Sequence, residues 1–229
     1  MLRLQHVAMR YGDGPEVLRD LNLTLAPGEF VFVIGPNGAG KTSLLRLLGL
    51  LHRPCAGNLF LFGEDVAQLS QDRRAALRRR IGVVFQDVRL LDHLSVFENA
   101  ALPLRIAGGS DEQIDGFVAE MLAAVGLGGV ITARPATLSM GQRQLVNVAR
   151  AVITRPSLLL CDEPTAHIDD KLVRRLLHLF TRLSKLGTAI VLTTRSEDLV
   201  EQSPRPILRL AGGRLRRPAA VSSVTAAAD

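Results

Sequence analysis

Apolar and polar residues alternate near the start of the chain, and this pattern predicts β-strands. Residues 2–10 and 16–25 alternate in this way, and the turn cluster Tyr11-Gly12-Asp13-Gly14-Pro15 separates them. Residues 57–63 predict one more short strand. Continuous apolar runs predict strands that are buried on both faces, at residues 29–34, 81–85, 157–161 and 188–193.

Helical spacing of apolar residues fills much of the chain between the buried runs. It is found after the run at 29–34, in a basic segment before residue 80, in 111–125 up to Gly126, from the N-cap Ser139 to about Thr154, and in 169–185 up to Gly187. Strands that alternate with helices predict a largely parallel sheet. The helices of residues 92–150 interrupt that alternation and predict an inserted subdomain.

Composition limits the class of protein. The chain is 47% hydrophobic, but no apolar run approaches the ~18–20 residues that a membrane span requires. The first residues, Met1 to His6, lack the apolar core of a signal peptide. These features predict a cytosolic protein. Cys55 and Cys161 fit no metal-binding spacing, and Cys161 lies in an apolar run that predicts burial.

The net charge of +6 leaves three interpretations open. Much of the excess lies in Arg73–Arg80 and Arg214–Arg217. These segments indicate a nucleic acid, an anionic membrane surface, or simply a solvated helix face and a basic tail. One tyrosine and no tryptophan argue against a platform that stacks single-stranded nucleic acid.

The first candidate site is a phosphate-binding loop. Gly35-Pro36-Asn37-Gly38-Ala39-Gly40-Lys41-Thr42 fits G-x-x-x-x-G-K-[ST] between a predicted strand and a predicted helix. Glycines let backbone N–H groups turn inward, and the helix dipole adds positive potential. We expect Lys41 to reach the β- and γ-phosphates and Thr42 to hold Mg²⁺. The motif predicts that the chain binds a nucleoside triphosphate.

Two carboxylates follow a buried strand in Leu158-Leu159-Leu160-Cys161-Asp162-Glu163. At the end of that strand, Asp162 is expected to complete the Mg²⁺ shell beside Thr42. Glu163 is expected to polarise a water molecule for in-line attack on the γ-phosphate. Adjacent acids often decorate loops, but these two follow four apolar residues in a chain that also contains a phosphate loop.

A capped helix start in Leu138-Ser139-Met140-Gly141-Gln142 supplies a second anion site, and one subunit cannot use both sites on one phosphate chain. Together these motifs resemble the nucleotide-binding subunits of ABC transporters over residues 1–215. The resemblance implies an α/β P-loop NTPase fold with a mostly parallel core sheet, an N-terminal antiparallel β subdomain and an inserted helical subdomain at about 92–150. Residues 216–229 are expected to form a disordered tail.

The resemblance also implies roles for individual residues in ATP and Mg²⁺ binding. Tyr11 matches the aromatic residue that stacks on adenine, and Ser43 follows the phosphate loop. Gln86 matches the glutamine that links the Mg²⁺ site to the membrane partner. In that family Ser139, Gly141 and Gln142 of a second copy complete a head-to-tail homodimer across ATP. Asp169 matches the aspartate that communicates across this dimer.

Two positions depart from the family pattern. The signature loop has Met140 where the family has glycine, so a side chain is expected to crowd the loop there. Arg195 stands where the family has a histidine that contacts the γ-phosphate and orients water. A longer, permanently charged arginine either replaces that clamp or points away and leaves hydrolysis slow. We therefore expect ATP binding and dimer closure with reduced turnover, and the alternative is a switch with little hydrolysis.

The segment Phe85–Leu104, with Arg78–Gln86 before it, is most similar to the cell-division (FtsE) branch of the family. That branch implies an FtsX-like integral membrane subunit, peripheral association with the cytoplasmic face of the inner membrane, and control of peptidoglycan hydrolases. Lipoprotein-release and macrolide-export ATPases share much of the segment and are the alternatives. Its apolar residues serve either the core or the membrane partner, namely Leu90, Leu91, Val96 and Phe97.

Overall fold

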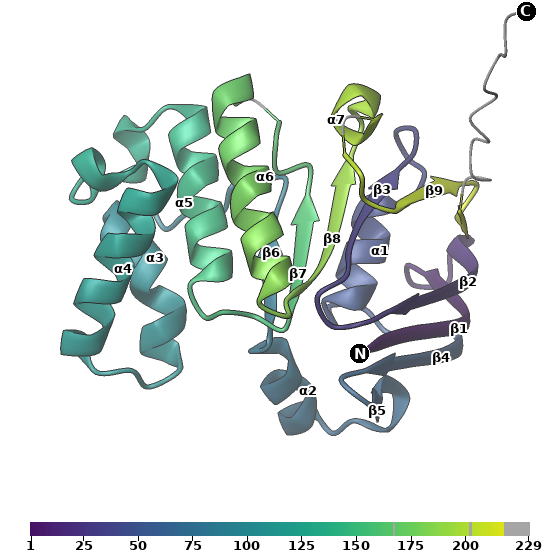
Figure 1. Cartoon of the computed structure of the whole chain (residues 1–229). Coiled ribbons are helices and arrows are strands. Elements are labelled where there is room, and N and C mark those ends of the chain that lie inside the picture. The colour runs from purple at the N-terminus through teal and green to yellow at the C-terminus, as the bar shows by residue number, and fades with distance from the viewer. Residues whose placement is uncertain (167, 202, 218–229) are drawn as a thin grey trace, which may run out of the picture.

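The computed structural model describes residues 1–166, 168–201 and 203–217, and it contains two β-sheets and a group of helices (Figure 1). The smaller sheet has four strands in the order β2-β1-β4-β5, and its three pairings are antiparallel. The register pairs Leu2 with Leu25 on one side and with Leu61 on the other. Its strands are β1 (Leu2–Arg10), β2 (Glu16–Leu25), β4 (Ala56–Leu61) and β5 (Glu64–Asp65).

The larger sheet has six strands in the order β10-β9-β3-β8-β7-β6. Its pairings are parallel from β9 to β6, and only β10 pairs antiparallel, with β9. The carboxyl ends of the parallel strands therefore meet at one edge of the sheet. The strands are β3 (Phe30–Ile34), β6 (Ile81–Val84), β7 (Leu158–Asp162), β8 (Ala189–Thr194), β9 (Ile207–Ala211) and β10 (Arg214–Arg216).

The described residues form seven α-helices. They are α1 (Lys41–Leu48), α2 (Gln71–Arg78), α3 (Val96–Ile106), α4 (Asp111–Val125), α5 (Met140–Val152), α6 (Asp170–Lys185) and α7 (Glu197–Glu201). The helices α3, α4 and α5 pack on one another beside the sheet (Figure 1). Capping boxes begin α3 at Ser95 and α5 at Ser139, while Gly126 ends α4 in the left-handed region.

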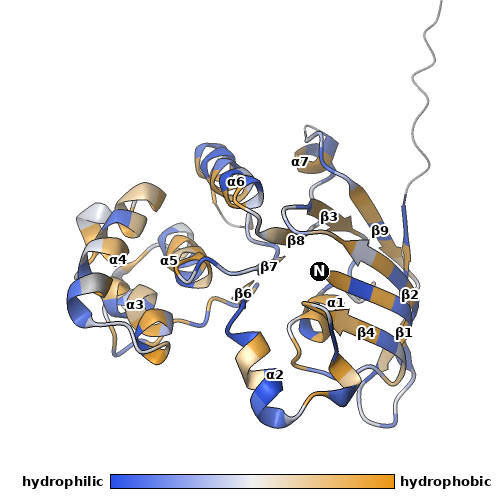
Figure 2. Ribbon diagram, turned by 60° about the horizontal axis from the view of Figure 1, so that its bottom comes forward, coloured by the Kyte–Doolittle hydropathy of each residue, from blue (hydrophilic) through white to orange (hydrophobic). Residues whose placement is uncertain are grey.

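Alternate residues of the central strands face two separate hydrophobic cores. Phe32 and Leu192 belong to the core shared with α3–α6, whereas Val33 and Val191 belong to the core shared with α1 and the antiparallel sheet. This is the period of two expected of a strand that is covered on both faces. Figure 2 shows β3 and β9 mostly as hydrophobic, while α6 carries both kinds of residue.

These findings confirm the predicted fold class and the buried strands. The hairpin of β9 and β10 was not predicted, because Pro204 and Pro206 before it favour a loop. The helix α7 was not predicted either, because its five residues are too few to show a helical repeat. Gly212-Gly213 between two short alternating runs was the signal for that hairpin. The strand β10 includes Arg216 of the expected tail, and residues 218–229 lie outside the described residues. Over the described ranges, no helix is both long and apolar enough to span a membrane.

Candidate functional site

The phosphate loop joins β3 to α1 at the carboxyl edge of the parallel sheet. Gly40 caps α1 in the left-handed region at φ 102°, and an added Cβ there would lie 2.9 Å from Leu18 Cδ2. At Gly35 an added Cβ would lie 2.2 Å from the carbonyl oxygen of Leu210 on β9. Only glycine fits this close approach to the neighbouring strand. The two glycines thus fix the loop between the antiparallel sheet and β9.

A pocket of about 240 Å³ opens at this loop. Residues from five separate segments line it, so the fold brings together groups that are far apart in the sequence. Most of the predicted site is present, and Val17 is an addition that no sequence signal indicated. The lining consists of Val17, Asn37–Ser43, Gln86, Asp162, Glu163 and Arg195.

Lys41 and the start of α1 bring groups that favour an anion to this pocket. The Nζ atom of Lys41 donates to the carbonyl oxygens of Gly35 at 2.7 Å and Pro36 at 3.2 Å, so the loop's own backbone holds the ammonium group. No side chain caps the first turn of α1, and its N–H groups stay available for an anion. A phosphate chain is the ligand that such a loop and helix start favour.

Asp162 and Thr42 lie in the same pocket as Gln86, and all three supply oxygen atoms. The buried hydroxyl of Thr193 donates to Asp162 Oδ1 at 2.8 Å, which orients the carboxylate. Carboxylate, hydroxyl and amide oxygens are the ligands that Mg²⁺ prefers. The residues therefore fit the predicted ion. Thr193 itself was not predicted, since a threonine in a buried strand carries no sequence signal.

Glu163 follows Asp162 directly and adopts a strained backbone conformation, with φ at 49°. Its side chain is 9% exposed, and its backbone N–H donates to Thr193 Oγ1 at 3.3 Å. Burial raises the pKa of Glu163 above its ordinary value, while the positive charges of Arg195 and Lys41 oppose this rise. A carboxylate with a raised pKa at a phosphate pocket is a candidate general base.

Arg195 points toward Glu163. Its Nε lies 3.2 Å from Glu163 Oε1, and its backbone N–H donates to Glu163 Oε2 at 3.2 Å. A third contact runs from Arg195 Nη1 to Asn37 Oδ1 in the phosphate loop at 3.4 Å. The guanidinium therefore bridges the carboxylate and the loop at the mouth of the pocket.

Tyr11 lies next to this pocket but does not line it. Its hydroxyl is 3.0 Å from Ser43 Oγ, and its ring meets the edge of the His52 ring at a centroid distance of 4.9 Å. The side chain is partly exposed, with 38% of the residue surface accessible. An exposed aromatic ring tethered to the start of α1 is suited to contact a base attached to the phosphates.

The signature residues do not line the pocket. Ser139 and Gln142 form a capping box at the start of α5, since Ser139 Oγ accepts from the Gln142 N–H and Gln142 Oε1 accepts from the Ser139 N–H. Met140 beside them is 54% exposed. Asp169 caps α6 by accepting from the Leu172 N–H at 2.9 Å. Gly141 belongs to the first turn of α5 and is likewise absent from the pocket lining.

Polar side chains on α5 tie this helix to the pocket. Asn147 Nδ2 donates to the carbonyl oxygen of Phe85 at 3.0 Å, beside Gln86, and Arg150 Nη1 donates to that of Arg89 at 2.6 Å. One turn earlier, Gln144 Nε2 donates to the carbonyl oxygen of Pro164 at 3.3 Å, beside Glu163. The sequence alone did not reveal these contacts, because each one joins residues far apart in the chain.

A second, smaller pocket lies beside Gln86, with apolar walls from α1 and β6 and the charged side chains of Arg46 and Arg89. The loop that follows it is shaped by buried Asn99, which contacts the backbone of Leu91, Leu94 and Ser95. The core interpretation of the apolar segment is confirmed for Val96, and docking of a membrane partner stays a prediction. Val96 is fully buried in the core, whereas Leu91 is 38% exposed.

Known proteins match this chain in sequence and in fold. Residues 18–166 match the family described as ABC transporter. The chain is 38% identical over 215 residues to the cell division ATP-binding protein FtsE of Escherichia coli strain K12, covering 94% of the chain and 97% of that relative. It is 41% identical over 219 residues to the methionine import ATP-binding protein MetN of Xylella fastidiosa, covering 94% of the chain and 65% of MetN.

Solved structures show the same fold. A dimeric, post-hydrolysis structure of the ATP-binding cassette MJ0796 bound to ADP and Pi has a TM-score of 0.87 and 30% sequence identity. The match covers 95% of this chain and 97% of that one. Another dimeric structure of MJ0796, a bacterial ABC transporter cassette, has a TM-score of 0.88 with the same coverage.

Proposed function

The chain belongs to the ABC transporter family of ATP-binding proteins, and from this premise we propose that it is the ATPase subunit of a cell-division type membrane complex. Cassettes of this family form dimers and work with membrane subunits. We propose that ATP binding closes two copies of this chain head to tail, and that closure drives or gates the membrane subunit.

One observation carries the ATPase proposal. The phosphate loop, the oxygen-donor set and the buried Glu163 line a single pocket of about 240 Å³. Lys41 and the uncapped start of α1 would hold the phosphate chain. Thr42, Gln86 and Asp162 would hold Mg²⁺, which neutralises charge on the β- and γ-phosphates when bound.

Glu163 is the proposed general base. A water oxygen would attack Pγ in line while the bond from Pγ to the bridging oxygen breaks, and the electron pair of that bond leaves with ADP. The water proton would pass to the Glu163 carboxylate. The burial that raises the pKa of Glu163 favours this proton transfer.

The position of the signature residues supports the dimer. Ser139, Gly141 and Gln142 are absent from the pocket lining of their own chain, although they begin a capped helix that favours an anion. A second copy, turned head to tail, would present them to the γ-phosphate. Met140 stands where a close approach is expected, and its exposed, flexible side chain can turn aside.

We propose that Arg195 slows basal turnover without preventing ATP binding. The ion pair with Arg195 holds the Glu163 carboxylate away from a water molecule until the guanidinium leaves it. A γ-phosphate offers the guanidinium a stronger anionic partner. The chain would then bind ATP and close readily but hydrolyse it slowly, and the second candidate is a switch with very little hydrolysis.

For the membrane partner we propose an FtsX-like subunit at the cytoplasmic face of the inner membrane. The support is the match to FtsE over 97% of that relative, whereas MetN extends well beyond the matched region. The pocket beside Gln86 and the exposed Leu91 offer a docking point for a cytoplasmic helix of such a subunit. Methionine import and the lipoprotein-release or macrolide-export types remain the competing assignments.

Calorimetric titration with Mg²⁺ and ATP tests the proposed site. The wild-type chain is expected to bind, and Lys41→Ala should weaken binding by at least tenfold, since a charge-assisted contact to phosphate is lost. Lys185→Ala, at the far end of α6, is the matched control and should bind as wild type does. Equal ATP affinity of Lys41→Ala and wild type would refute the proposed site.

A further inference from the structure

A groove of about 970 Å³ lies at the opposite end of the sheet from the phosphate pocket. Pro156 and Ser157 line it just before β7, Thr188 just before β8, and Arg80 just before β6. Because these strands are parallel, their amino ends share one edge of the sheet, and the phosphate loop follows the other edge. An occupant of the groove would not touch the nucleotide.

The walls of the groove come from segments that are distant in the sequence. Phe117 and Met121 of α4 form one wall, and Leu179 of α6 and Leu186 directly after α6 form the other. Leu186 is 81% exposed, more than any other exposed large hydrophobic residue of the described chain. Phe62 in the turn between β4 and β5 closes one end. A partly exposed apolar surface of this kind is characteristic of an interaction site.

Charge distinguishes this groove from an ordinary surface depression. Among its described lining residues the charged ones are three exposed arginines, Arg80, Arg155 and Arg182. Within the described ranges none of the three guanidinium groups has a carboxylate partner. The acid beside Arg80 is Glu64, and Arg73 already holds both of its oxygens at 2.7 Å.

Two of these cations rest on aromatic rings at the rim. The Arg80 guanidinium lies 3.9 Å from the Phe62 ring centroid, and that of Arg155 lies 5.1 Å from the Phe117 centroid. Stacking holds a guanidinium in place and leaves its N–H donors free at the ring's edge. Arg155 also adopts a left-handed backbone at φ 49° directly before Pro156, where proline favours an extended residue. Such strain is concentrated at functional positions.

We propose that this groove binds an acidic amphipathic helix of a protein partner. The apolar walls would take the hydrophobic face of the helix, and the arginines would pair with carboxylates along its flanks. A flat bilayer surface cannot enter a concave groove, so the apolar walls would stay uncovered on a membrane. Since α4 and α6 form opposite walls, the bound helix would brace the α3–α5 helices against the sheet.

The test uses a fluorescein-labelled synthetic helix of about 18 residues, long enough to be helical in water, with a leucine stripe flanked by glutamates. Fluorescence anisotropy with the full chain should give saturable binding. Arg182→Glu and Leu186→Glu should each weaken it by roughly tenfold or more. A second peptide with lysines in place of the glutamates should bind at least tenfold more weakly than the first.

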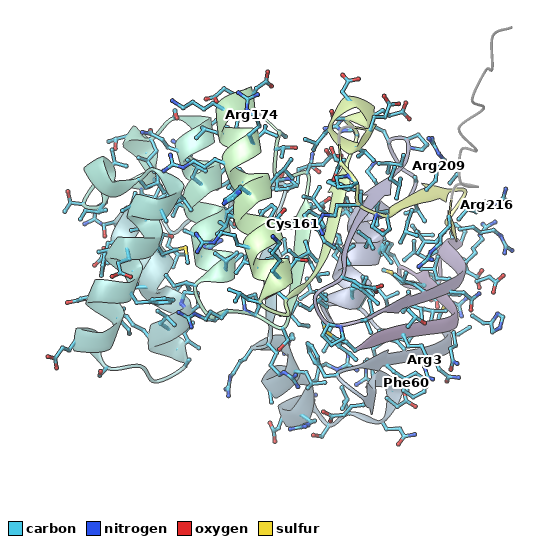
Figure 3. The ribbon with its side chains drawn as sticks, in the orientation of Figure 1. Arg3, Phe60, Cys161, Arg174, Arg209 and Arg216 are labelled. Carbon is cyan, nitrogen blue, oxygen red and sulfur yellow. The ribbon has the colours of Figure 1, made fainter. Side chains whose placement is uncertain are left out.

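Matched variants separate the groove from general charge effects. Arg174→Glu makes the same charge change near the other end of α6, where Figure 3 labels Arg174, and should alter affinity by less than about twofold because salt screens distant charges. Ile106→Glu, at an exposed residue of α3, is the control for Leu186→Glu.

Four results would overturn the proposal. The first is that the glutamate peptide does not bind the wild-type chain, and the second is that Arg174→Glu and Arg182→Glu weaken its binding equally. The third is that the lysine peptide binds as tightly as the glutamate peptide. The fourth is that the chain captures phosphatidylglycerol vesicles, and that Arg182→Glu abolishes this capture but leaves peptide binding unchanged. The last result would assign the arginines to lipid headgroups instead. None of these outcomes depends on ATP binding or hydrolysis.

Discussion

Two contacts tie the residue Arg195 to Glu163, one from Nε to Oε1 and one from the backbone N–H to Oε2, both at 3.2 Å. We expect Arg195→His to raise kcat for ATP hydrolysis by about tenfold, a barrier change of about 1.4 kcal/mol, because the carboxylate is released from its ion pair. The affinity for ATP should change by less than kcat does. Steady-state phosphate release and ATP titration measure the two quantities separately.

Arg209→Ala is the matched control for this substitution. It removes an exposed arginine whose Nη2 lies 3.5 Å from Glu197 Oε1, near the same edge of the sheet. Exposed ion pairs contribute little, so kcat should stay within about twofold of wild type. An Arg195→His rate equal to that of wild type would contradict the proposed restraint on Glu163.

The hydroxyl of Thr193 contacts both acidic residues at the carboxyl end of β7. Its fully buried hydroxyl donates to Asp162 Oδ1 at 2.8 Å and accepts from the Glu163 N–H. Thr193→Val keeps the shape but removes a hydrogen bond to a charged group, and should lower the free energy of unfolding by about 1.5–3 kcal/mol. Urea denaturation measures this change, and Thr137→Val, which loses an exposed local bond to the Arg134 carbonyl oxygen, should cost under about 1 kcal/mol. Equal losses would contradict the role of Thr193.

At the scale of elements, the start of α5 has two roles that can be separated. Ser139 and Ser95 both begin helices with capping boxes. Ser139→Ala and Ser95→Ala should each lower stability by about 1 kcal/mol, as thermal or urea unfolding would show. Only Ser139→Ala should weaken ATP-dependent dimerisation, since only that helix start is proposed to face the second copy. Equal weakening of the dimer by Ser95→Ala would indicate a purely structural effect.

The elements themselves were largely predictable, because the signals for them are local. Continuous apolar runs gave the central strands, and Gly126 marked the end of α4 where a left-handed residue is needed. The hairpin of β9 and β10 was missed because prolines outweighed a weak two-residue turn signal. Local pattern also gave the loop 35–42 and the pair Asp162-Glu163, which the fold brings into one pocket.

The contacts between segments that are distant in the sequence could not be predicted. The bond from Asn147 to the Phe85 carbonyl and the bond from Arg195 to Glu163 depend on how β6, α5 and β8 are placed in space. Arg195 was recognised as unusual, but either direction of its side chain was compatible with the sequence. The fold decides that it points inward.

At the scale of the whole molecule, the two cysteines report on global unfolding. Cys55 is exposed, whereas Cys161 is fully buried in the central sheet, and burial raises the pKa of the Cys161 thiol well above its ordinary value. The thiolate is the reactive form, so Cys161 should resist alkylation at pH 8 while Cys55 reacts at once. In denaturant both should react, with Cys161 following the unfolding transition. Mass spectrometry of labelled peptides measures this, and rapid labelling of native Cys161 would contradict the packed sheet.

At the same scale, we propose that each chain holds half of a nucleotide site that a second copy completes. The phosphate pocket contains Lys41, Asp162 and Glu163, but Ser139, Gly141 and Gln142 at the start of α5 are absent from its lining within one chain. The most direct test is sedimentation velocity of Glu163→Gln, which is expected to retain ATP without hydrolysing it. We predict a dimer with Mg²⁺ and ATP, and a monomer with ADP or when Gly141→Glu is added. A chain that binds ATP but stays monomeric would contradict the proposed dimer. So would a dimer that forms equally with ATP, with ADP and with Gly141→Glu.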